Sequence, residues 1–190
     1  MVRPPTIYRG DITVRALNRG DEAAWLELRD RNRAWLRPWE ATEPGPTAER
    51  SMSFPAFVRL DRRLFRRRRA INMAIEHRGS LVGRVCISNI EWGPARHGSL
   101  GYWLDEQHAG LGIMPRAVAM LTEYGFRWGL HRVEIAARPE NEASHRVATK
   151  LGFWDEGTRR KHLYIDGDWR DHRVFSLTAD DLRPGEFWDS

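Results

Sequence analysis

Apolar and polar residues alternate along several short stretches of the chain, and each stretch predicts a β-strand. The first is Ile12 to Leu17, where the alternation is imperfect. Ala70 to Ile75 and Leu81 to Ile90 follow, and the turn sequence His77 to Ser80 between them predicts a hairpin. A fourth strand, around Ser99 to Leu104, completes this first group.

Apolar residues at helical spacing predict helices between and after these strands. The expected helical regions are Asp21 up to Pro38, a helix within Thr47 to Arg69, Pro115 to Trp128, and Asn141 to Lys150. The further expected strands are a short one at Val133 and Ile135, then Thr158 to Ile165 and Trp169 to Leu177, the last two joined by a type I′ turn at Asp166-Gly167.

The order strand, helix, strand from Ser99 to Ile135 predicts a right-handed crossover between two parallel strands. The hairpin from Ala70 to Ile90 and the pair of strands joined at Asp166-Gly167 add antiparallel neighbours. The sequence therefore predicts a mixed α/β sheet in a single domain of residues 1–190, with residues 1–10 and 184–190 as loose termini.

The loop from Gln107 to Met114 connects the fourth strand to the following helix and carries two glycines. Gly110 and Gly112 permit positive φ, so successive N–H groups can converge on an anion at the positive end of the helix. The spacing is not the dinucleotide fingerprint, since Pro115 stands where a third glycine would be, and no Gly-Lys-Ser/Thr follows. The loop is interpreted as a phosphate site, although a glycine-bearing turn is the alternative.

The loop fits the pattern Q/R-x-x-G-x-G/A, and further motifs follow it: Leu130-His131-Arg132-Val133-Glu134, Pro139-Glu140-Asn141-Glu142-Ala143-Ser144, Lys150-Leu151-Gly152-Phe153, and Ile165-Asp166-Gly167-Asp168-Trp169-Arg170-Asp171. In this order the motifs resemble the GCN5-related N-acetyltransferase (GNAT) superfamily, and within it the ribosomal-protein-alanine N-acetyltransferases of the RimJ and RimL type. The resemblance is dense from about Leu81 to Leu177.

The resemblance implies a GNAT-like domain, with a mostly antiparallel sheet flanked by helices and one splayed parallel pair that holds the pantetheine arm of acetyl-CoA, the acetyl donor. The cofactor-binding residues carried over from the family are Trp103 and Leu104 along the arm, Gln107, His108, Ala109, Gly110, Leu111, Gly112, Ile113 and Met114 around the pyrophosphate, Asn141 and Ser144 near the thioester, and Lys150 at the cofactor phosphates.

The resemblance also implies direct transfer, in which a neutral amine attacks the thioester and the CoA thiolate leaves. Ser144 is the candidate for protonating the thiolate, and a helix-capping role is compatible with it. Glu134 is the candidate base, with a solvated strand-face glutamate as the alternative. The pattern departs from the family at Ala148, where many members have a tyrosine acid, and at Leu163, where some RimL-like proteins have a carboxylate.

Other titratable residues carry less information. His145, His162 and His172 lie near the implied site in sequence but are interpreted as surface histidines. Cys86, the single cysteine, lies in an apolar run and is expected to be a buried thiol rather than a nucleophile. No His/Cys/Asp cluster has metal-ligand spacing.

Composition and charge indicate where the protein is located and what its surface can bind. The chain has no stretch of 18 apolar residues and no signal sequence, so a soluble cytoplasmic protein is expected. Its formal net charge is +5, and a run of arginines stands out: Arg62, Arg63, Arg66, Arg67, Arg68 and Arg69. Such a run favours contact with phosphate, as in a ribosome or RNA, with a solvated helix face as the alternative.

The expected acceptor is the N-terminal α-amine of a protein, of the alanine type, such as a ribosomal protein. A small-molecule amine, a lysine side chain, and a catalytically weak ribosome- or RNA-binding module on the same fold remain alternatives, and a homodimer is an open expectation. The family places the loop Trp39 to Pro46 beside the acceptor groove, with a packed surface loop as the alternative for Trp39.

Overall fold

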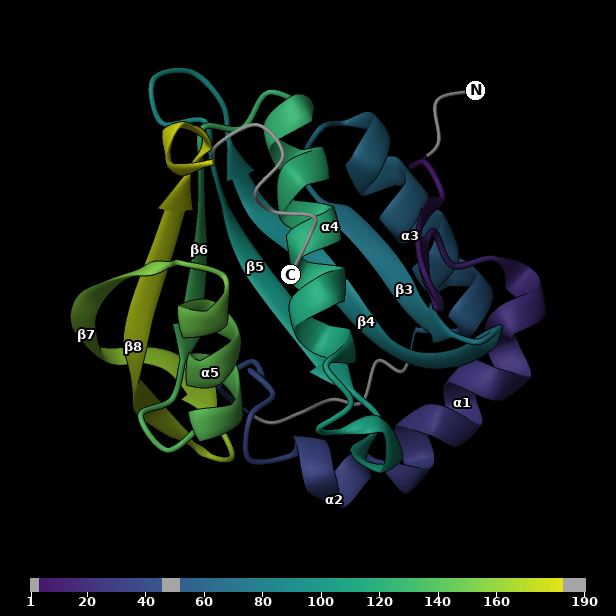
Figure 1. Ribbon diagram of the computed structural model, residues 1–190. Helices are drawn as coiled ribbons and strands as arrows, with labels where there is room; N and C mark the ends of the chain where they lie inside the picture. Colours follow the sequence, from purple (N-terminus) through teal and green to yellow (C-terminus); the bar gives the residue numbers. More distant parts are fainter. Residues whose placement is uncertain (1–3, 46–51, 183–190) are drawn as a thin grey trace.

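One mixed sheet of eight strands runs through the molecule (Figure 1). The computed structural model describes residues 4–45 and 52–182. The spatial order is β1-β2-β3-β4-β5-β6-β8-β7, and every neighbouring pair is antiparallel except β5 and β6. The strands are β1 Ile7–Arg9, β2 Ile12–Arg15, β3 Ile71–His77, β4 Ser80–Glu91, β5 His97–Leu104, β6 Arg132–Ala137, β7 Trp154–Ile165 and β8 Asp168–Thr178.

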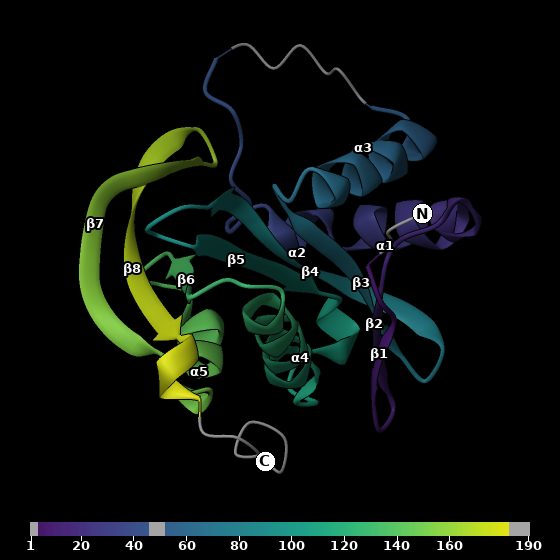
Figure 2. The ribbon, with the colours of Figure 1, turned by 90° about the horizontal axis from the view of Figure 1, so that it is seen from above.

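Helices cover both faces of the sheet (Figure 2). On one face lie α1 Glu22–Arg31, α2 Arg33–Leu36 and α3 Phe54–Arg66, and on the other α4 Ile113–Arg127 and α5 Glu142–Lys150. Short 3₁₀ turns are Arg19–Asp21, Glu106–His108 and Ala179–Asp181. The larger core cluster, with Ile71, Ile113 and Ile135, lies beneath α4, and a smaller one around Trp25, Phe54 and Val58 lies beneath α1 and α3.

The parallel pair is joined at only one end. The register of β5 with β6 runs from His97↔Arg132 to Leu100↔Ile135 and stops there, whereas β5 stays paired with β4 as far as Gly83↔Leu104. Residues 101–104 of β5 therefore present an edge toward β6 that no described strand occupies. This arrangement confirms the predicted mixed sheet with a splayed parallel pair.

The free part of β5 depends on close contact with β4. At Gly83 an added Cβ would lie 2.4 Å from the carbonyl oxygen of Trp103, so no larger residue fits without moving the strand. Glycine at this position lets β4 pair closely with β5. The opposite edge of β5 at residues 101–104 borders the space between β5 and β6, which is called the gap below.

Several predicted boundaries were wrong. Residues 7–9 of the expected loose N-terminus form β1, because Ile7 packs against the larger core and pairs with Val14. The helix expected up to Pro38 is divided at Asn32, whose buried amide bonds Leu28 O and Asp105. The strand expected from Thr158 begins at Trp154. The residues 184–190 and part of the Thr47–Arg69 region lie outside the described residues.

No helix in the described part of the chain is long and apolar enough to cross a membrane. Burial raises the pKa of the Cys86 thiol, which fits the expectation of an unreactive cysteine.

Candidate active site

The glycine loop lies where β5 ends and α4 begins. Gly110 has φ +80° and Gly112 has φ +69°, and Gly112 is the N-cap of α4. An added Cβ at either glycine would meet open space, so the constraint on side chains is the left-handed backbone itself. Free N–H groups of the first turn and the helix dipole favour an anion here.

The other residues predicted around the pyrophosphate have different surroundings. Gln107, Ala109 and Leu111 are exposed, whereas the side chains of Ile113 and Met114 belong to the core. Ile113 and Met114 therefore have only backbone groups to offer a ligand.

A buried carboxylate, Asp105, anchors the loop to α1. Its oxygens accept hydrogen bonds from Arg31 Nη2 at 2.7 Å and Asn32 Nδ2 at 2.8 Å, and they pair with His108 Nδ1 at 2.9 Å. Asn32 Oδ1 in turn accepts from the backbone N–H of Glu106 at 2.9 Å. Burial alone would raise the pKa of Asp105, but these hydrogen bonds outweigh it and lower the pKa to about 2. The His108 ring is thus part of the anchor.

The N-terminus of α5 faces β5 across the gap. Asn141 caps the helix by accepting from Ser144 N at 3.0 Å, and Ser144 Oγ lies 2.6 Å from the hydroxyl of Tyr102. Burial raises the pKa of Tyr102 to about 12, although the hydrogen bond to Ser144 opposes this. Tyr102 therefore keeps its proton near neutral pH. The structure brings Ser144 together with a hydroxyl that the sequence analysis missed.

Trp103 and Leu104 alternate across β5. The Trp103 ring packs on Trp25 at 5.4 Å, in the smaller core cluster, and Leu104 packs against the larger one. Both side chains are taken up by the core, so the groups that these two residues present to the gap are their backbone N–H and C=O. Lys150 lies exposed in the last turn of α5, about 9 Å along the axis from Ser144, and its role stays a prediction.

Glu134 lies in the paired part of β6, opposite Ser99. It is only 8% exposed, so the alternative of a solvated glutamate was wrong. Its carboxylate contacts Arg132 Nη2 at 2.8 Å and Arg159 Nη1 at 3.0 Å. Burial would raise its pKa, but hydrogen bonds from both arginines dominate and lower it. This lowered proton affinity works against a role as base.

The segment after α2 is fastened to the β7–β8 hairpin. Thr42 N donates to Tyr164 O at 2.9 Å, and Arg37 Nε pairs with Asp166 at 2.8 Å. Arg138, just after β6, donates from Nη1 to Pro38 O at 2.9 Å. The described part of the segment predicted to lie beside the acceptor, residues 39–45, therefore lies next to the end of β6 and the β7–β8 hairpin, on the side of the sheet away from α5 (Figure 2).

Two of the three histidines interpreted as surface residues are buried. His145 is 8% exposed, with its ring 5.4 Å from Phe175, and His172 is 1% exposed. His162 is half-buried. No group of three or more His, Cys, Asp or Glu among the described residues could hold a metal ion.

The chain is similar to known proteins in sequence and in structure. A family model described as Acetyltransferase (GNAT) domain matches residues 11–154. Probable N-acetyltransferase YjcK of Bacillus subtilis (strain 168) is 40% identical over 102 residues, which is 53% of this chain and 56% of that protein. The ribosomal protein uS5-alanine N-acetyltransferase of Escherichia coli (strain K12) is 29% identical over 174 residues, 87% of each. The solved structure of Mycobacterium smegmatis RimJ in complex with CoA-disulfide has a TM-score of 0.85 and 34% identity, covering 91% of this chain and 84% of that chain.

Replacing Asp105 by Asn should destabilise the fold at pH 7 by about 2 kcal/mol, the equivalent of its lowered pKa. Because the folded-state pKa is depressed, the carboxylate stabilises the native protein above the unfolded pKa of about 4, and that contribution is lost as pH falls toward about 2. Urea unfolding across this range should show a shallower acid loss in Asp105→Asn than in wild type. Asp30→Asn, on an exposed pair with Arg33, is the control. Equal stability of Asp105→Asn and wild type would contradict the anchor.

Proposed function

The chain belongs to the GNAT acetyltransferase family and is an N-acetyltransferase that takes its acetyl group from acetyl-CoA, and we propose that its acceptor is a protein N-terminal α-amine, most directly that of a ribosomal protein beginning with alanine. The family assignment confirms the resemblance inferred from the motifs. Support for the acceptor comes from the similarity, over 87% of both chains, to an enzyme named for alanine of ribosomal protein uS5. An acceptor of this class would place the reaction in the cytoplasm.

The observation that supports an acetyl-CoA site is the free edge of β5. Backbone N–H and C=O groups of residues 101–104 face the gap, and strand pairing is the natural way to satisfy them. An extended arm with two amides, such as the pantetheine arm of CoA, would pair there, and the diphosphate of CoA would meet the N–H groups at Gly110 and Gly112. We propose these residues as the donor site.

Ser144 and Tyr102 are proposed to serve the leaving group. The amine nitrogen forms the new C–N bond, the C–S bond breaks, and the CoA sulfur takes up a proton. Both hydroxyls are protonated near neutral pH, and they lie 2.6 Å apart. One hydroxyl therefore donates its proton to the sulfur, while the other donates a hydrogen bond to that first hydroxyl.

The acceptor class is tested with four substrates and intact-mass detection: a peptide beginning with Ala, one beginning with Ser, an N-terminally blocked peptide with an internal lysine, and a polyamine. The proposal expects acetylation of the Ala peptide above all others and none of the blocked peptide. Faster acetylation of the lysine or of the polyamine would contradict the proposed acceptor and assign that amine instead. No transfer to any amine, with acetyl-CoA bound, would favour a binding module.

The same assay examines the hydroxyl pair. Ser144→Ala and Tyr102→Phe should each lower kcat by about a hundredfold, the low end for proton transfer, because a water partly replaces a hydroxyl. The double variant should be little worse than either single one, since the two act as a unit. CoA affinity by calorimetry should be retained. Full kcat in both single variants would remove the pair from the chemistry.

We also propose that the arginine run at the C-terminal end of α3 and just beyond it contacts RNA, although one arginine of the run has another role. Arg68 lies between two rings, 4.1 Å from the centroid of Trp92 and 4.5 Å from that of Trp128. Among described residues no ion pair or hydrogen bond engages the other guanidinium groups of the run, those of Arg62, Arg63, Arg66, Arg67 and Arg69. Clustered, unneutralised charge of this kind favours a phosphate backbone.

RNA affinity should therefore fall steeply with salt, and replacing Arg63, Arg66 and Arg67 by Gln should flatten that dependence. The measurement is anisotropy of a labelled ribosomal RNA fragment over a salt series. Three exposed arginines elsewhere, Arg19, Arg78 and Arg160, replaced together, provide a charge-matched control. The same slope in both triple variants would leave the arginine run as solvated surface charge.

A further inference from the structure

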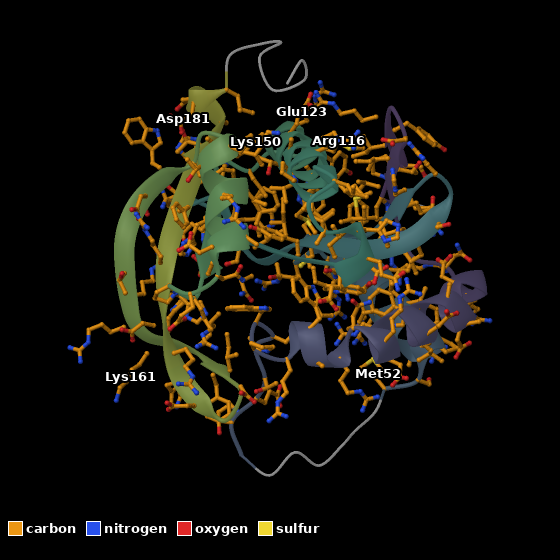
Figure 3. All side chains as sticks on the ribbon, turned by 60° about the horizontal axis from the view of Figure 1, so that its bottom comes forward. Met52, Arg116, Glu123, Lys150, Lys161 and Asp181 are labelled. Carbon is orange, nitrogen blue, oxygen red and sulfur yellow. The ribbon has the colours of Figure 1, made fainter. Side chains whose placement is uncertain are left out.

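The strand pairing of β7 with β8 is interrupted by a bulge. Arg159 pairs with His172 and Leu163 with Arg170, so three residues of β7 lie opposite Asp171 alone. At the centre of the bulge Lys161 has φ +47°, and its N–H donates to Asp171 Oδ1 at 2.8 Å. A bulge of this kind changes the direction of the side chains beside it. Figure 3 shows Lys161 on the outer side of the hairpin.

The bulge brings two imidazoles together. The rings of His162 and His172 lie 5.6 Å apart between centroids, at 73° to each other. His172 Nδ1 is 2.9 Å from the carbonyl oxygen of Arg170, and because a carbonyl only accepts, Nδ1 carries the proton. His172 is thus fixed and shielded at 1% exposure. His162 is half-buried, and no described residue forms a hydrogen bond with its ring.

Both rings lie on the side of the sheet that α5 does not cover. Successive residues of a strand point to opposite faces, and Phe175 contacts His145 of α5, so His172 and Ser176 point the other way. Ser176 is opposite Glu134 in the ladder, which places Glu134 on that same face. The segment after α2 lies on this side of the sheet and is held there by Arg138 through Pro38 O. An acceptor that enters opposite the donor would meet this face.

Burial is the main reason that the pKa of each imidazole is lowered, and the neighbouring charges modify this effect. For His162, burial lowers the pKa, Arg159 lowers it further, and Glu134 opposes them. For His172, burial lowers the pKa, the Arg170 carbonyl raises it, and His162, Arg138 and Asp171 add smaller effects of both signs. A neutral imidazole has a lone pair for a proton at physiological pH. Glu134, held by two arginines, does not compete for that proton.

We infer that His162 is the general base that removes the proton from the attacking amine, with His172 as the residue that positions it. This inference rests on the proposed function, because it assumes an amine acceptor on that face. As the C–N bond forms, the proton on nitrogen passes to the free ring nitrogen of His162. The CoA sulfur receives its proton from the Tyr102–Ser144 pair. Water then carries the proton that His162 releases back to that pair, so that both groups regain their starting protonation states.

The test compares kcat/KM against pH for the Ala-initiated peptide in wild type and His162→Gln. The wild-type enzyme needs both a neutral amine, of pKa about 8, and a neutral imidazole, so log kcat/KM should fall with a slope of about two at low pH. His162→Gln should lose about a hundredfold in rate and fall with a slope of about one. Lys161→Gln, which changes the exposed neighbour, should behave as wild type.

A second variant separates chemistry from folding. His162→Ala should bind CoA as wild type does, lose about a hundredfold in kcat, and regain activity when free imidazole is added. Loss of activity with CoA binding intact and no rescue by imidazole would overturn the inference, as would an unchanged slope in His162→Gln. A wild-type enzyme that prefers lysine or polyamine would instead contradict the proposed function, and the same comparison is then made with that amine.

Discussion

The feature on which the rest of the structure depends is the incomplete pairing of β5 with β6. Four register pairs join the strands at one end, and β5 then continues along β4 alone. A strand edge with unsatisfied N–H and C=O groups inside a protein needs a partner, and a ligand with amides supplies one. The gap also brings two helix N-termini, those of α4 and α5, to the same end of the sheet (Figure 1).

The two faces of the sheet separate the two halves of the proposed chemistry. On the face of α4 and α5 lie the glycine loop and the Tyr102–Ser144 pair, which serve the donor. On the opposite face lie the segment after α2 and the imidazole pair of His162 and His172, which would serve the acceptor. A reaction at the gap can therefore take a proton from the amine on one side and supply a proton to the sulfur on the other.

The sequence predicted those features that local patterns encode. The crossover, the phosphate loop and the N-terminus of α5 follow from periodicity, glycine spacing and the motif Pro139 to Ser144. The missed features depend on contacts between distant residues. Asp105 meets Arg31 from 74 positions away, and Tyr102 meets Ser144 across 42. For Tyr102 a signal existed, since the alternation of β5 puts it on the face of Leu100 beneath α4 and α5. The bulge that re-aims His162 had no such signal, because it depends on the register with β8.

The central claim, that the free edge of β5 holds the donor, is tested most directly by amide hydrogen exchange with and without CoA. The account predicts slower exchange on CoA binding at the amides of residues 101–104 that do not bond β4, and at the start of α4. The β7–β8 hairpin should exchange at the same rate in both states. Unchanged exchange along residues 101–104, with protection gained elsewhere at saturating CoA, would contradict the account.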